Sequence, residues 1–204
     1  EVLDHTFDHV DYVSIHTYYG NANDDTPSFL SKPDDLGDFI DEVVAACDYV
    51  AAKRRSRKRV MLSFDEWNVW YHSHGTEKDI LDWSVAPPLL EDAYTAEDAL
   101  VVGGMLITLL NHCDRVRIAC LAQVVNVIAA IRTVKGGPAW RQTIFHPFAQ
   151  ASAQGRGTVL DQVVESPCYD AADRQGVPYL KSACVRDLEA GSLTVFALTR
   201  SMDE

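Results

Sequence analysis

The chain has 204 residues, of which 47% are hydrophobic, and its 30 acidic and 18 basic residues give a formal net charge of −12. This composition is that of a globular chain with a core, long enough for one large domain or one domain plus part of another. The negative charge argues against a nucleic-acid partner, because a phosphate backbone attracts basic surfaces. The apolar stretches are interrupted by polar residues before they could span a bilayer, so no membrane partner is expected.

Neither a disulfide framework nor a metal site is expected. The five cysteines are odd in number and widely spaced, and none forms a C-x-x-C pair. His72-Ser73-His74 is the one local histidine cluster, but it has no acidic or third histidine neighbour at ligand spacing.

The first two thirds of the chain alternate strand and helix patterns. Apolar, β-rich runs predict strands at 10–16, 60–64 and 116–123. After a polar loop over 20–33, Asp34 is the predicted N-cap of a helix that ends in the basic run 53–59. Thr95 is the predicted N-cap of a second helix within 93–110. The order strand–helix–strand–helix–strand predicts an α/β fold with parallel βαβ units.

Two adjacent glycines interrupt the second predicted helix. Gly103 and Gly104 each cost about 1 kcal/mol relative to alanine in a helix interior. Such a cost indicates close packing against a neighbouring element.

The pattern changes after about residue 133. Strand candidates at 158–165, 179–187 and 192–199 are separated by Gly, Pro and Asp, and 188–191 fits a hairpin turn between the last two. We therefore expect an antiparallel β-domain over 136–204, with too few strands to be complete.

Polar and aromatic side chains follow each of the three apolar strands. His16 and Tyr18 end the first strand, Asp65-Glu66-Trp67-Asn68 the second, and Gln123 the third. In a parallel α/β barrel, strand ends of this kind form the active site. Adjacent side chains in a strand point to opposite faces, so we expect only one carboxylate of the acidic pair to face the site. The alternative is a salt-bridged pair in an exposed loop. The nearby Trp67 and Trp70 suit a sugar site, because aromatic faces stack on sugar rings.

Four segments together resemble the α-L-arabinofuranosidases of glycoside hydrolase family 51: 12–21, 64–71, 121–126 and 141–148. The resemblance covers essentially the whole chain. It implies that residues 1–135 are the C-terminal part of a (β/α)₈ barrel and that 136–204 begin a β-sandwich or jelly-roll domain. It also implies a retaining enzyme that acts on arabinose-containing oligo- or polysaccharides without a metal or organic cofactor.

The resemblance assigns roles to five residues. Glu66 matches the family's catalytic nucleophile, at the end of the seventh barrel strand. His16 and Tyr18 match sugar-site residues from the sixth strand. Trp70 matches an aromatic wall of the arabinose pocket, and Gln123 a hydrogen-bonding residue from the eighth strand. We expect these side chains to converge on Glu66.

One departure from the family pattern is large. The family's acid/base is a Glu that directly follows an Asn, and no Asn-Glu dipeptide occurs in this sequence. The acid/base is therefore expected outside this chain, and the isolated chain is expected to be inactive. Should it be active, Asp65 and Asp114 are the carboxylates to examine first. We expect the longer protein to be a cytoplasmic homo-oligomer. The alternatives are a non-catalytic carbohydrate-binding or assembly fragment, and another retaining glycosidase such as a xylosidase or endoglucanase.

Overall fold

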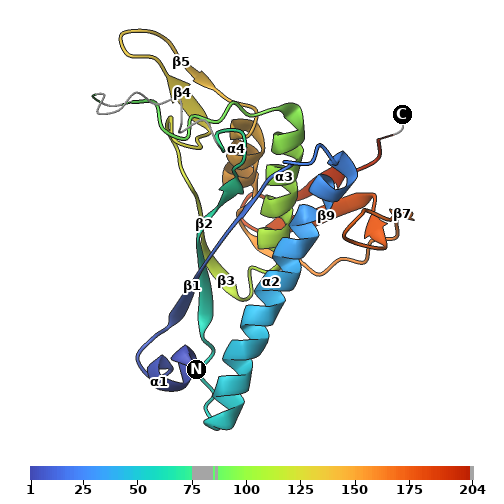
Figure 1. Ribbon diagram of the computed structural model, residues 1–204. Helices are drawn as coiled ribbons and strands as arrows, with labels where there is room; N and C mark the ends of the chain where they lie inside the picture. Colours follow the sequence, from blue (N-terminus) through green and yellow to red (C-terminus); the bar gives the residue numbers. More distant parts are fainter. Residues whose placement is uncertain (75–84, 86, 203–204) are drawn as a thin grey trace.

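The computed structural model describes residues 1–74, 85 and 87–202. Its central element is a parallel sheet in the order β1 (Tyr12–Tyr19), β2 (Met61–Val69) and β3 (Val116–Leu121). Helix α1 (Val2–Thr6) precedes β1, α2 (Thr26–Lys53) joins β1 to β2, and α3 (Ala96–Asn111) precedes β3. Figure 1 shows α2 and α3 side by side on one side of this sheet. The mixed α/β class and the parallel strand order are confirmed, and the described strands form an open sheet.

Helix α2 begins earlier than the sequence predicted. Residues 26–33 are helical, so the predicted loop over 20–33 and the predicted N-cap at Asp34 are wrong. The cap is Asp25, whose carboxylate accepts hydrogen bonds from the backbone N–H and the hydroxyl of Ser28. Pro27 occupies the first turn, where its missing N–H costs nothing. Pro33 lies inside the helix, where proline is normally unfavourable, and this is why the sequence pattern was misleading.

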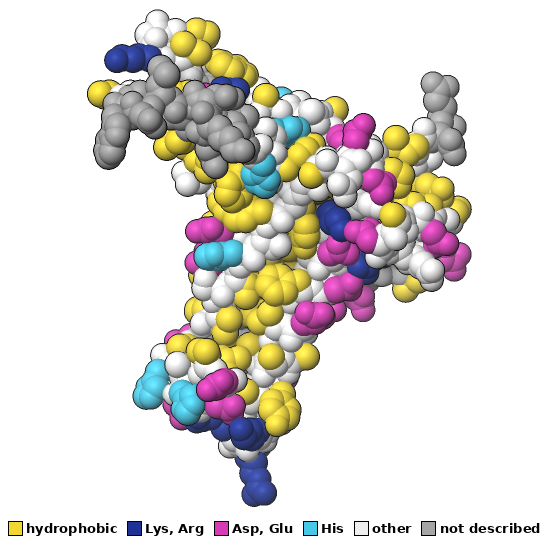
Figure 2. Space-filling view, viewed as in Figure 1, with side chains coloured by type: hydrophobic (Ala, Val, Ile, Leu, Met, Phe, Trp, Pro, Cys, Tyr) yellow, Lys and Arg dark blue, Asp and Glu magenta, His cyan; other side chains and the backbone are white. Residues whose placement is uncertain are grey.

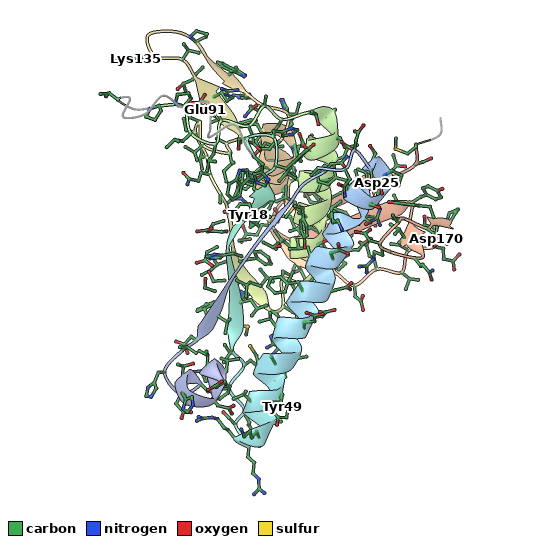
Figure 3. All side chains as sticks on the ribbon, viewed as in Figure 1. Tyr18, Asp25, Tyr49, Glu91, Lys135 and Asp170 are labelled. Carbon is green, nitrogen blue, oxygen red and sulfur yellow. The ribbon has the colours of Figure 1, made fainter. Side chains whose placement is uncertain are left out.

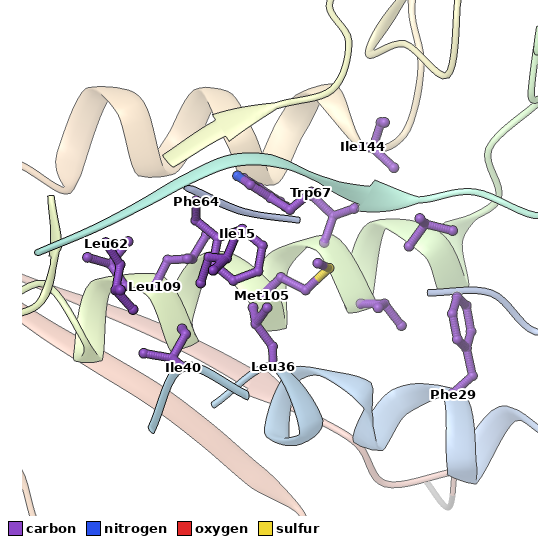
Figure 4. Packing of buried hydrophobic residues seen from close by; sticks show 14 of the residues in the cluster. Ile15, Phe29, Leu36, Ile40, Leu62, Phe64, Trp67, Met105, Leu109 and Ile144 are labelled. Carbon is purple, nitrogen blue, oxygen red and sulfur yellow. The ribbon is translucent and has the colours of Figure 1, made fainter. Parts of the chain in front are cut away.

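The hydrophobic core fills the space between the sheet and the two helices (Figure 4). Leu62 and Phe64 of β2 are fully buried, as are Ile40 of α2 and Met105 of α3. The face of the sheet that these residues line is therefore the covered one.

The expected close packing at the paired glycines is confirmed at one of them. A Cβ built on Gly104 would lie 2.6 Å from Cγ of Pro33 and 3.1 Å from Cδ2 of Leu198. A Cβ on Gly103 would meet only Cβ of Pro147, at 3.5 Å, an ordinary contact. The hydroxyl of Thr108 also donates to the carbonyl of Pro33, at 2.7 Å. Helices α2 and α3 thus approach closely where the ring of Pro33 faces Gly104.

The remaining elements follow β3. They are the hairpin β4 (Ile131–Thr133) and β5 (Ala139–Arg141), helix α4 (Phe145–Gln154), the pair β7 (Cys168–Tyr169) and β8 (Val177–Pro178), and an antiparallel sheet in the order β10 (Ser192–Thr199), β9 (Leu180–Asp187) and β6 (Thr158–Leu160). The predicted antiparallel strands and the turn at 188–191 are confirmed, although β6 is shorter than expected. The sequence analysis did not predict α4. None of the helices in the described ranges is long and apolar enough to cross a membrane.

The antiparallel sheet is attached to the helices by an apolar contact and an ion cluster. Ile107 of α3 is buried against Ala183 and Leu198. Asp34 of α2, the residue expected to be a cap, accepts hydrogen bonds from Lys181 at 2.6 Å and from Arg200, whose side chain is 1% exposed. Burial opposes ionisation of Asp34, but the two cations outweigh it and lower the pKa of its carboxyl. This cluster joins α2 to the far end of the chain.

The Pro33–Gly104 contact predicts opposite effects for two neighbouring substitutions. Gly104→Ala should lower the free energy of unfolding by about 1–3 kcal/mol, because the rigid proline ring cannot move aside. Gly103→Ala should be neutral or stabilising by up to about 1 kcal/mol, since alanine favours the helix. Denaturant unfolding of both variants checks this. Equal effects at the two positions would contradict the assigned contact.

Candidate active site

The acidic pair Asp65-Glu66 lies at an irregularity of β2. Before it, Leu62 and Phe64 point into the core; after it, Trp67 and Val69 do. The interval from Phe64 to Trp67 is three residues instead of two or four, and the pairing of β2 with β3 shifts register there. A β-bulge of this kind inserts an extra residue and redirects the side chains around it.

The bulge places both carboxylates on the open face of the sheet. Asp65 and Glu66 both lie beside His16 of the neighbouring strand, on the face away from α2 and α3. The expectation that adjacent side chains would point to opposite faces is therefore wrong, because strict alternation holds only in a regular strand. Figure 2 shows acidic side chains and a histidine together at the edge of the molecule.

His16 lies between the two carboxylates. Its Nδ1 is 3.6 Å from Oε2 of Glu66, and its Nε2 is 3.5 Å from Oδ1 of Asp65. The hydroxyl of Ser14 donates to Oδ1 of Asp65 at 2.8 Å and lies 3.2 Å from Nε2 of His16. The hydrogen bond from Ser14 is the main cause that lowers the pKa of Asp65, and His16 adds to it.

Tyr18 is the direct hydrogen-bond partner of Glu66. Its hydroxyl donates to Oε2 of Glu66 at 2.9 Å. Burial, followed by the hydrogen bond and the charge of Glu66, raises the pKa of Tyr18 to about 12, so the phenol remains a donor at neutral pH. Figure 3 shows Tyr18 beside β2. Trp70 packs edge-on against the Tyr18 ring, with the centroids 5.4 Å apart.

Both contacts to Glu66 converge on the same oxygen. Tyr18 and His16 both face Oε2, while the hydrogen bonds among the described residues leave Oε1 without a partner. One oxygen of this half-exposed carboxylate is thus held, and the other is open to the face of the sheet.

Gln123 lies at the same end of the sheet but does not reach Glu66. It is exposed directly after β3, and the preceding residue, Ala122, donates its backbone N–H to the carbonyl of Trp67 at 3.2 Å. Within the described part of the chain, no hydrogen bond joins the Gln123 side chain to Glu66. The structure therefore brings His16 and Tyr18 to Glu66, packs Trp70 against Tyr18, and places Gln123 on the next strand end.

Asp114 lies at the other end of the sheet. It precedes β3, whose first residue, Val116, pairs with Leu62 at the start of β2, and its carboxylate pairs with Arg59. Asp114 is therefore too far along the sheet to act beside Glu66.

Sequence reasoning gave no role to Asn68, which joins the strand ends. Asn68 is fully buried, and its Nδ2 donates to the carbonyls of Ala122 and Ile128, at 2.8 and 2.7 Å, and to the hydroxyl of Tyr94. Tyr94 in turn donates to the carbonyl of Val69. The sequence does offer one indication of this role, because Asn68 is a polar residue between the apolar Trp67 and Val69.

A buried aspartate holds the loop that carries Trp70. Asp92 is 1% exposed and accepts the backbone N–H groups of Tyr71, His72 and Ser73 at 3.0–3.3 Å. Nε2 of His72 lies 2.8 Å from Oδ2 of Asp98, and Asp98 is fully buried at the start of α3. The described residues include no group of three side chains that could hold a metal ion.

The Asn68 network predicts a large effect of a small change. Asn68→Asp keeps the shape but replaces the amide NH2 group by an oxygen that faces two carbonyls, so it should destabilise the fold by about 3 kcal/mol or more. Asn23→Ala, an exposed loop change, should have an effect within about 0.5 kcal/mol. Thermal unfolding compares the two. A stable Asn68→Asp variant would contradict the network.

Comparison with known proteins identifies the family. Residues 65–203 match the model of the α-L-arabinofuranosidase C-terminal domain. The intracellular exo-α-(1→5)-L-arabinofuranosidase of Halalkalibacterium halodurans is 59% identical over 203 residues, which cover 100% of this chain and 41% of that protein.

Solved structures agree with this match. A family 51 α-L-arabinofuranosidase from Bifidobacterium longum aligns with a TM-score of 0.90 and 39% identity, over 99% of this chain and 41% of that one. An α-L-arabinofuranosidase from Thermotoga maritima, in complex with arabinose, aligns with a TM-score of 0.76 and 26% identity, over 95% and 39%. The chain thus spans about two fifths of these relatives. It belongs to the α-L-arabinofuranosidases of glycoside hydrolase family 51, of which it carries the C-terminal part.

Proposed function

We propose that this chain is part of a retaining hydrolase that releases terminal, non-reducing α-L-arabinofuranose from arabinan, arabinoxylan or arabino-oligosaccharides. The observation that carries the proposal is the environment of Glu66. Its carboxylate is half-exposed at the carboxyl ends of parallel strands, with one oxygen held by Tyr18 and His16 and the other without a hydrogen-bond partner among the described residues. A carboxylate that attacks a sugar carbon needs this combination of a fixed position and an open oxygen.

In the proposed mechanism, Oε1 of Glu66 attacks the anomeric carbon and forms a glycosyl ester. A second carboxyl group protonates the leaving oxygen and then activates the water that hydrolyses the ester. Tyr18 and His16 hold Oε2 during both steps. Trp70 forms an aromatic wall of the pocket, and Gln123 binds a sugar hydroxyl.

The second carboxyl group is proposed to lie in a part of the longer protein outside this chain. Asp114 lies at the wrong end of the sheet. Asp65 shares a strand and a histidine with Glu66, so it approaches from the same side.

Because general acid catalysis contributes about 10²–10⁴-fold, the isolated chain should leave nitrophenyl arabinofuranoside intact.

We propose that β1, β2 and β3 are the last strands of a (β/α)₈ barrel, with residues 1–135 in the barrel and 136–204 in the beginning of a β-sandwich or jelly-roll domain. The parallel order and the two helices on one face support the first part, and the antiparallel sheet supports the second.

A cytoplasmic location is proposed because the Halalkalibacterium halodurans relative is named intracellular. A homo-oligomeric state of the longer protein stays a prediction.

The nucleophile assignment predicts a chemical rescue. In the longer protein, Glu66→Ala should abolish hydrolysis of nitrophenyl α-L-arabinofuranoside, because no ester can form. Added azide should restore turnover and give a glycosyl azide of inverted configuration, since azide attacks from the vacated side. Asp114→Ala is the matched control and should hydrolyse the substrate normally.

Two outcomes would contradict this assignment. Unchanged hydrolysis by Glu66→Ala would exclude Glu66 as the nucleophile. A wild-type preference for nitrophenyl β-D-xyloside would assign the site to another retaining glycosidase.

A further inference from the structure

We propose that Asp65, held by Ser14, is a positioning residue that orients the imidazole of His16 toward Glu66. The inference rests on the proposed role of Glu66 as nucleophile and adds a chain of contacts behind it. This chain runs from the Ser14 hydroxyl through Asp65 and His16 to Oε2 of Glu66.

The contacts give each ring nitrogen of His16 a carboxylate. Nε2 lies 3.5 Å from Oδ1 of Asp65 and 3.2 Å from the Ser14 hydroxyl that holds this carboxylate, and Nδ1 lies 3.6 Å from Oε2 of Glu66. In the protonated ring, each N–H group therefore has a carboxylate within ion-pair distance. A half-turn of the ring would place carbon atoms against both carboxylates and lose both interactions. The two acceptors together select one ring orientation.

Packing alone does not fix this orientation. The side chains of His16 and Asp65 are 46% and 41% exposed, so neither is confined by the core. What confines Asp65 is the hydrogen bond from Ser14, which lies two residues before His16 on the same face of β1. That bond also helps to keep Asp65 ionised, and an ionised carboxylate is the stronger acceptor for an imidazole N–H.

The bulge in β2 makes this arrangement possible. In a regular strand Asp65 would point to the face opposite Glu66, and one histidine could not contact both. Because the extra residue brings both carboxylates to the open face, the side chain next to the proposed nucleophile can support it through His16. Asp65 thereby acts on Glu66 without touching the sugar.

The test uses the longer protein and compares four variants by kcat and KM on nitrophenyl α-L-arabinofuranoside. Asp65→Ala should lower kcat about tenfold or more while KM changes by less than about threefold, the pattern of a group that supports reaction rather than binding. Ser14→Ala should lower kcat in the same direction. Ser14→Thr keeps the hydroxyl, so its kcat should be close to that of the wild type. Asp8→Asn, at an exposed pair with Arg54, is the control and should match wild type.

Coupling between the two residues is the sharper readout. Since the Ser14 hydroxyl contacts both Asp65 and Nε2 of His16, the loss of kcat in the double variant Ser14→Ala/Asp65→Ala should be smaller than the two single losses combined. Fully additive losses, or wild-type kcat in a folded Asp65→Ala variant, would overturn the proposal.

A measurement without turnover separates this inference from the proposed function. Nitrogen NMR of the His16 ring should show a changed Nε2 signal in both Asp65→Ala and Ser14→Ala, and an unchanged one in Ser14→Thr. Identical His16 signals in wild type and Asp65→Ala would overturn the positioning role whatever the activity. A wild-type protein without arabinofuranosidase activity, but with the expected His16 signals, would overturn the proposed function and leave the contact chain standing.

Discussion

The single extra residue in β2 between Phe64 and Trp67 is the constraint on which the site depends. Upstream of it, even-numbered residues fill the core; downstream, Trp67 and Val69 do. The strand thus buries large apolar groups on both sides of the irregularity and still turns Asp65 and Glu66 outward. Without the bulge, one of two adjacent carboxylates would point into an apolar core, where an unpaired charge is costly. Core packing and site geometry are satisfied by the same local distortion.

Buried polar groups hold the surroundings of that distortion in place. Asn68 ties the end of β2 to the backbone after β3, and Asp92 ties down the loop that carries Trp70. Farther away, the contact of Pro33 with Gly104 sets the distance between α2 and α3, and the Asp34 cluster attaches the antiparallel sheet to α2. Each of these contacts joins residues far apart in sequence. Buried, well-packed contacts therefore fix the strands and loops that carry the exposed side chains of the site.

Sequence patterns predicted the parallel strands, the second helix with its cap at Thr95, and the antiparallel hairpin, because these depend on local periodicity and turn residues. The start of α2 was mispredicted because Pro33 and the polar composition of residues 20–33 are typical of a loop, although Asp25 caps the helix. The resemblance groups His16, Tyr18, Trp70 and Gln123 with Glu66, and in the structure the Gln123 side chain makes no hydrogen bond to Glu66 within the described part of the chain. The bulge was not predicted, since it depends on pairing with two neighbouring strands, and for the same reason Asn68 and Ser14 had no assigned role.

The central claim is that Glu66 forms a covalent bond with the sugar. The most direct measurement is to incubate the longer protein with a 2-fluoro arabinofuranoside that slows hydrolysis of the ester, digest it, and sequence the modified peptide by mass spectrometry. The account predicts one added 2-deoxy-2-fluoro-arabinosyl group, on Glu66, in the peptide that spans the end of β2. A label on Asp65 or on any other carboxylate would contradict it. So would complete hydrolysis of the reagent to a sugar of inverted anomeric configuration with no labelled residue.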